Sequence, residues 1–194
     1  MNRPIYAFYG HHKCATMSLN TLSGAVCKRI GRNFSVVYNE DQFSRNLDKY
    51  CQDNNVDFLA YGNADINFVR NLPYHKAFHI IRDPRDIVVS AYYSHGYSHS
   101  TSDWPELVEH RKKLQSLSPD EGITEEIRFR RRSFEHMYNW DYEQDGILTN
   151  SEFLNDLTKD QAITKMCSWL KERDLGEKTV NYKLSFASIS TNIF

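Results

Sequence analysis

A lysine and a threonine lie in a short turn that joins a predicted strand to a predicted helix. The segment reads Tyr-Ala-Phe-Tyr-Gly-His-His-Lys-Cys-Ala-Thr-Met-Ser-Leu over residues 6–19. The first-turn N–H groups of a helix have no partners inside the helix, and the positive end of the helix dipole lies beside them, so phosphate or sulfonate oxygens are favoured there. We therefore predict an anion site in which Lys13 supplies an ammonium and Thr16 a hydroxyl.

The same turn differs from the nucleotide-binding pattern GxxxxGK[ST] in the position of its lysine. Gly10 matches the first glycine, but Ala15 replaces the second and Thr16 stands where the lysine belongs. The lysine is displaced to Lys13, and we see no acidic strand end suited to holding magnesium. These differences argue against a nucleotide or small-molecule kinase, which we keep as an alternative.

A second segment, residues 79–94, places an arginine at the end of an apolar strand and a serine on the helix that follows. Asp83 can cap that helix and Pro84 suits its first position, because the missing N–H of proline would be unpaired there anyway. Ser90 lies six residues after Pro84, about 9 Å along the helix. Arg82 offers a fork of donors suited to phosphate, and Ser90 adds a hydroxyl. The charged residues Asp83, Arg85 and Asp86 are better explained as a capped, salt-bridged helix start.

Together the two segments resemble those of sulfotransferases that use 3′-phosphoadenosine 5′-phosphosulfate (PAPS). Lys13 to Thr16 resemble the 5′-phosphosulfate loop, with Ala15 in place of the family's glycine, so we expect Ala15 not to have a positive φ. Arg82 and Ser90 match the two ligands of the 3′-phosphate. The resemblance implies a P-loop-like fold, PAPS as sulfonate donor without a metal, and Lys13 beside the departing phosphate oxygen. The cofactor-binding residues it implies are His12, Lys13, Cys14, Ala15, Thr16, Met17, Arg82 and Ser90.

The base that takes the acceptor's proton is predicted from the topology. Ligands of parallel sheets gather at the carboxyl ends of the strands, and two acidic residues follow predicted strands there. Glu40 is our first choice because the resemblance to Golgi-type relatives places a glutamate after the second strand, and Asp65 is the second choice. The alternative is that either carboxylate caps the adjacent helix.

Apolar runs alternate with amphipathic stretches, which predicts an α/β fold of three layers with a mainly parallel sheet flanked by helices. We expect a single domain over residues 1–194, with a helical lid or insertion around 96–132. The predicted strands are 5–9, 34–38, 57–61, 77–81 and 146–149. The predicted helices are 16–30, 41–53, 84–97, 104–117, 121–140 and 160–173.

The composition limits the partners. A formal net charge of -1 gives no field that would attract nucleic acid or an anionic membrane. No apolar run is long enough to span a bilayer, and an apolar strand begins by Ile5, so we expect a cytoplasmic monomer or homodimer. The four cysteines form no CxxC pair, and we predict no metal site.

Three further expectations concern function. The cluster of Arg128, Arg130, Arg131 and Arg132 is read as a solvated helical face, in preference to an anion contact. The acceptor is expected to be a hydroxyl or amine on a small molecule or glycan. Besides the kinase, a catalytically silent nucleotide-binding module stays open as an alternative.

Overall fold

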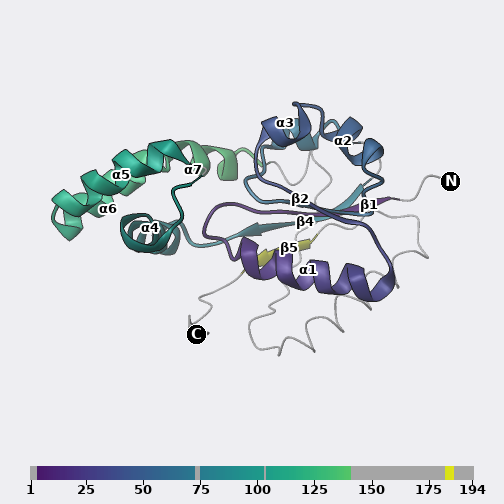
Figure 1. Ribbon diagram of the computed structural model, residues 1–194, viewed down its shortest axis with the longest axis horizontal. Helices are drawn as coiled ribbons and strands as arrows, with labels where there is room; N and C mark the ends of the chain where they lie inside the picture. The colour runs from purple at the N-terminus through teal and green to yellow at the C-terminus, as the bar shows by residue number, and fades with distance from the viewer. Residues whose placement is uncertain (1–3, 73–74, 103, 141–181, 186–194) are drawn as a thin grey trace.

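The computed structural model describes residues 4–72, 75–102, 104–140 and 182–185 (Figure 1). Its centre is a sheet of five parallel strands in the order β2-β3-β1-β4-β5. The strands are β1 (Ile5–Tyr9), β2 (Phe34–Val37), β3 (Phe58–Tyr61), β4 (His75–Ile81) and β5 (Tyr182–Ser185). The first four lie where the sequence predicts strands, and the prediction of a parallel sheet is confirmed. The strand β5 was not expected.

Helices cover both faces of the sheet, as predicted for three layers. Alternate residues of β1 point to opposite faces: Tyr6 and Phe8 pack with α1 (Thr16–Ile30), whereas Ala7 and Tyr9 pack on the other side. That other side carries the short helices, and Figure 1 shows them above the sheet with α1 below it. They are the 3₁₀ helix η1 (Glu40–Phe43), α2 (Leu47–Asp53) and α3 (Ile66–Val69).

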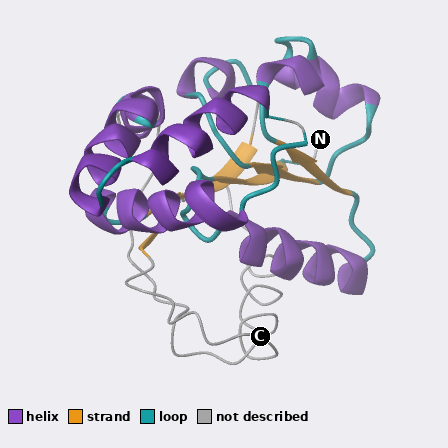
Figure 2. Cartoon of the chain, turned by 60° about the vertical axis from the view of Figure 1, so that its left-hand side comes forward, coloured by secondary structure: helices purple, strands orange, loops and turns teal. Residues whose placement is uncertain are grey.

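A group of helices lies beyond the carboxyl ends of the strands (Figures 1 and 2). It contains α4 (Pro84–Tyr93), the π-helical turn η2 (Ser94–Ser98), α5 (Pro105–Ser116), α6 (Pro119–Phe129) and α7 (Arg131–Tyr138). The helix α4 begins as predicted, with the Asp83 side chain accepting a hydrogen bond from the Arg85 N–H and Pro84 in the first turn. Within 96–132 the described residues include the end of η2, all of α5 and α6, and the start of α7; that this segment is a lid or insertion stays a prediction.

Several predicted helices are divided in the structure. The prediction for 41–53 is interrupted at Ser44 and Arg45, which both have positive φ, at 49° and 59°. The helix predicted over 121–140 begins earlier, at Pro119, and breaks at Arg130. The predicted strand 146–149 and helix 160–173 fall outside the described residues. Among the residues that are described, no helix combines the length and apolar character needed to cross a membrane.

Candidate functional site

The turn between β1 and α1 is tight and uses left-handed backbone at two non-glycine residues. Lys13 has a φ of 65° and Ala15 a φ of 59°. The carbonyl of His11 accepts two hydrogen bonds, from the Cys14 N–H at 3.1 Å and from the Thr16 hydroxyl at 2.9 Å. The expectation that Ala15 lacks a positive φ is therefore wrong: this turn needs a left-handed residue immediately before α1, and the alanine adopts that conformation.

Replacing Ala15 by glycine should stabilise the protein. The left-handed conformation costs an L-residue about 1–2 kcal/mol, and glycine removes this strain. The greater freedom of glycine in the unfolded chain lowers stability by about 0.4–1 kcal/mol and so offsets part of the gain. We expect Ala15→Gly to raise the free energy of unfolding by roughly 0.5–1 kcal/mol in urea titrations. The matched control is Ala25→Gly inside α1, which should lower it by about 1 kcal/mol. Destabilisation by both variants would contradict the strained turn.

The N-terminus of α1 is open to an anion. No side chain caps it, and its first turn contains no acidic residue. In contrast, α4 begins with the carboxylate cap of Asp83 and has Asp86 in its first turn. The first-turn N–H groups and the positive dipole end of α1 are thus not compensated by a carboxylate from within the helix.

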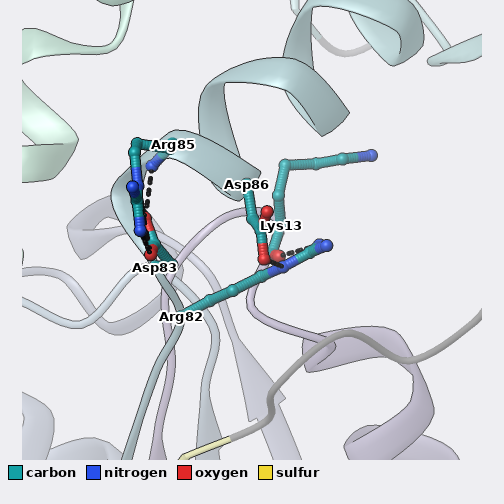
Figure 3. Close-up of polar contacts among 5 residues, drawn as sticks. All are labelled: Lys13, Arg82, Asp83, Arg85 and Asp86. Atoms are coloured by element: carbon teal, nitrogen blue, oxygen red, sulfur yellow. Dashed lines mark hydrogen bonds and ion pairs between the residues drawn. The ribbon is translucent and has the colours of Figure 1, made fainter.

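Arg82 joins the two predicted anion-binding segments. Its guanidinium donates a hydrogen bond to the carbonyl of Lys13 at 3.3 Å, and its Nε lies 3.7 Å from the carboxylate of Asp86. Figure 3 shows the side chain reaching from the end of β4 to the loop at Lys13. Because β1 and β4 are paired in parallel, their carboxyl ends are neighbours, and residues far apart in sequence meet there.

The rest of the second segment matches its predicted roles in part. Arg85 forms an ion pair with Asp83 at 2.6 Å, as expected for a salt-bridged helix start, although Asp86 pairs with Arg82. Ser90 is half-buried on α4. In the described part of the chain no hydrogen bond connects Ser90 to Arg82, and their prediction as two ligands of one phosphate stays a prediction.

The remaining loop residues differ in exposure. Cys14 is buried, and burial raises the pKa of its thiol to about 12. Met17 is exposed, and its sulfur accepts from the Tyr38 hydroxyl at 3.7 Å. Lys13 is half-buried, and burial, followed by the charges of Arg82 and Arg130, lowers the pKa of its ammonium group.

Arg130 corrects the interpretation of the arginine cluster as a solvated face. Its side chain is only 7% exposed, whereas Arg128, Arg131 and Arg132 are exposed as expected. The guanidinium carbon lies 5.8 Å from the centre of the Trp104 ring, a cation–π contact. Burial lowers the pKa of Arg130 to about 10, so it stays charged at neutral pH. One arginine of the run therefore faces the interior, beside the loop that carries Lys13.

A buried carboxylate holds histidines from two other elements. Glu126 on α6 accepts hydrogen bonds from His95 Nδ1 at 2.8 Å and from His110 Nε2 at 2.7 Å. Burial alone would raise the pKa of Glu126, but these two N–H donors outweigh it and the pKa is lowered. The carboxylate is therefore ionised and acts only as an acceptor. The protons of the two hydrogen bonds are thus on His95 Nδ1 and His110 Nε2.

The same network extends to the loop. His95 donates from Nδ1 to Glu126, so its Nε2 carries a lone pair when the ring is neutral. The Nε2 of His12 lies 3.0 Å from that nitrogen and is the donor. Burial lowers the pKa of both His12 and His95, which favours neutral rings at pH 7. His12, one of the predicted cofactor-binding residues, is thus positioned from the helical group.

The histidine and glutamate side chains also form the donor set of a metal site. Ligand atoms from His95, His110 and Glu126 lie within 4.8 Å of one another, and two imidazoles with one carboxylate suit zinc. In the structure both carboxylate oxygens are occupied by N–H donors, so the group is satisfied without an ion. The sequence did not point to this set, because its members lie 16 and 31 residues apart.

The two candidate bases follow different strands. Asp65 caps α3, its carboxylate accepting from the Asn67 N–H at 2.9 Å, and the neighbouring Ala64 N–H donates to the Gly10 carbonyl at 3.0 Å. Glu40 lies in η1, which follows the edge strand β2. Its carboxylate oxygen Oε1 is 3.4 Å from a guanidinium nitrogen of Arg45. Since β3 separates β2 from β1, Glu40 follows a strand about 10 Å from β1. The turn that holds Asp65 is therefore bonded to Gly10, at the start of the loop, whereas the segment before Glu40 reaches the start of α1 through the contact of Tyr38 with Met17.

Comparisons with known proteins assign no family to this chain. No protein-family model matches it, and no solved structure matches it. A leucine–tRNA ligase of Malacoplasma penetrans (strain HF-2) is 51% identical over 43 residues, which are 22% of this chain and 5% of the ligase. The chain therefore spans a small fraction of that relative's length, and the ligase's activity is not carried over.

Proposed function

We propose that the protein transfers a sulfonate group from PAPS to a hydroxyl or amine acceptor. The observation that carries the proposal is the hydrogen bond from Arg82 to the Lys13 carbonyl, because it sets the two anion-binding segments side by side. A donor with phosphate groups at both its 3′ and 5′ positions needs two anion-binding segments, one for each phosphate group. The uncapped N-terminus of α1 supports the assignment of the sulfonated end to the loop.

In the proposed reaction an acceptor oxygen or nitrogen attacks sulfur in line with the bond that breaks. A new bond to sulfur forms while the bond from sulfur to the 5′-phosphate oxygen breaks, and negative charge builds on that oxygen. The Lys13 ammonium stabilises this charge. The acceptor's proton passes to a carboxylate, and we now place Asp65 ahead of Glu40 because its turn bonds to the carbonyl of Gly10.

Calorimetry with 3′,5′-adenosine bisphosphate and AMP tests the proposal. Without magnesium, the bisphosphate should bind more tightly than AMP, since only it has a 3′-phosphate. We expect Arg82→Ala to weaken the binding of the bisphosphate by roughly 10- to 100-fold, because a charge-assisted hydrogen bond contributes about 1.5–3 kcal/mol. The affinity for AMP should stay nearly unchanged.

The matched control for this experiment is Arg85→Ala. Arg85 is exposed and pairs with Asp83, so its removal should change neither affinity. Equal losses for both nucleotides in Arg82→Ala would contradict the 3′-phosphate assignment. Magnesium-dependent ATP binding without preference for the bisphosphate would favour the kinase. Sulfonate transfer to a panel of hydroxyl and amine acceptors then separates an enzyme from a silent binding module.

A further inference from the structure

We propose that Arg130 binds the tetrahedral oxyanion at the N-terminus of α1, as a cationic contact additional to Lys13 and Arg82. The ligand class is a sulfate-like or phosphate-like group. The inference deepens the function proposed above, since in that reaction the oxyanion is the sulfonated end of the donor. It stands on its own observations, which concern a buried side chain outside both predicted segments.

The first observation is that a buried donor of Arg130 has no partner. The residue is 7% exposed, and its Nε has no hydrogen-bond acceptor among the described residues. An unpaired buried donor is unfavourable, and more so on a charged group, so native proteins pair nearly all of them. An oxyanion beside Arg130 would supply the missing acceptor.

The contact with Trp104 leaves a role for such a ligand. The guanidinium carbon lies over the Trp104 ring, 5.8 Å from its centre. A cation over an aromatic face is attracted by the ring and uses no N–H donor in a hydrogen bond. Trp104 therefore holds the charge of Arg130 without supplying the acceptor that its buried Nε lacks.

The position of the charge points to the loop. Trp104 contacts Arg130 and also the ring of His12, whose centre lies 5.9 Å from the Trp104 ring centre. Burial is the main cause that lowers the pKa of His12 and Lys13, and the positive charge of Arg130 adds to it. Arg130 and the turn before α1 thus share a neighbour. Cations gathered at one turn repel one another, and a dianion between them would reverse that effect.

No acidic side chain in the described part of the chain neutralises Arg130 directly. Glu126 lies one helical turn before it, and the Arg130 N–H donates to the Glu126 carbonyl at 2.9 Å. Both carboxylate oxygens of Glu126 are already occupied by His95 and His110. The Cys14 thiol is neutral, because burial raises its pKa to about 12. The acid nearest in sequence thus fixes the backbone of Arg130 and leaves the guanidinium for a ligand.

Titration with inorganic sulfate, monitored by thermal unfolding and calorimetry, tests the inference. Sodium chloride at equal ionic strength corrects for screening. Wild type should be stabilised by sulfate beyond the chloride control, and Arg130→Met, which keeps the length of the side chain without its charge, should bind sulfate roughly 10- to 100-fold more weakly. Arg131→Met is the matched control, because Arg131 is exposed and pairs with Glu135, and it should bind sulfate as wild type does.

The outcomes separate this inference from the proposed function. Sulfate affinity that is unchanged in Arg130→Met would overturn the inference, even if the bisphosphate is preferred over AMP. Loss of sulfate binding in Arg130→Met alone would support it, even if that preference is absent and the sulfotransferase proposal fails. If circular dichroism shows Arg130→Met to be unfolded, Arg130→Gln replaces it: weaker sulfate binding than in wild type supports the inference, and unchanged sulfate affinity overturns it. Wild-type stabilisation by sulfate no greater than in chloride also overturns it.

Discussion

Lys13→Ala is expected to slow sulfonate transfer by roughly 100- to 1,000-fold, the loss found when one preorganised donor to a developing negative charge is removed. Binding of 3′,5′-adenosine bisphosphate should change much less, because the lysine is assigned mainly to charge that appears in the transition state. The expectation rests on the position of Lys13 in the turn before α1, where burial and the neighbouring arginines already lower its pKa. Single-turnover kinetics with saturating donor measure the effect on the chemical step.

The control for this variant is Lys28→Ala. Lys28 is exposed in the last turn of the same helix, at the end away from the loop. Its removal should leave both turnover and bisphosphate binding unchanged. A turnover number for Lys13→Ala equal to that of wild type would remove the lysine from the mechanism. A loss confined to binding would make it a cofactor contact and no more.

Glu126→Gln should lower the free energy of unfolding by about 3 kcal/mol, as expected when one partner of a buried, hydrogen-bonded charged group is replaced. His95 and His110 bond to different oxygens of Glu126, so in glutamine one of the two N–H donors would face the amide NH₂ group instead of an acceptor. Its amide also places two new donors in a fully buried site. Urea titration followed by tryptophan fluorescence measures the loss, since Trp104 lies against His95.

Glu135→Gln is the control for the carboxylate variant. Glu135 is an exposed residue of α7 that pairs with Arg131, and its replacement should cost less than about 1 kcal/mol. Equal stability of Glu126→Gln and wild type would show that the two histidine hydrogen bonds do not contribute. A chelator that lowers the melting temperature of wild type, but not that of Glu126→Gln, would show that the cluster holds a metal.

The elements nearest the site were predicted well because their signals are local. The bounds of β1 and α1 agree with the prediction at both ends, since an apolar run meets a turn and then a helical pattern. The start of α4 was also predicted, because Asp83 followed by Pro84 is a helix start wherever it occurs. From these positions, the parallel pairing of β1 with β4 brings Arg82 to the loop.

The contribution of the helical group was missed because it depends on packing between distant residues. Arg130 stands in a run of arginines that is typical of a solvated helix face, but it lies one helical turn after Glu126 and shares its buried face. For His110 a signal was present: Leu107, His110 and Leu114 lie on one face of α5, and all three are buried. That face predicts a buried histidine, but the sequence does not give the carboxylate partner, which lies on another helix.

The hydrogen bond between His12 and His95 links the turn between β1 and α1 to the helical group, so that a movement of one affects the other. A neutral hydrogen bond contributes about 1 kcal/mol, roughly a fivefold change in an equilibrium, so thermal motion can break and remake it. Displacement of the turn η2 that carries His95 would release the ring of His12, and with it the backbone next to Lys13. Movement of the helical group would thereby change the conformational freedom of the turn before α1.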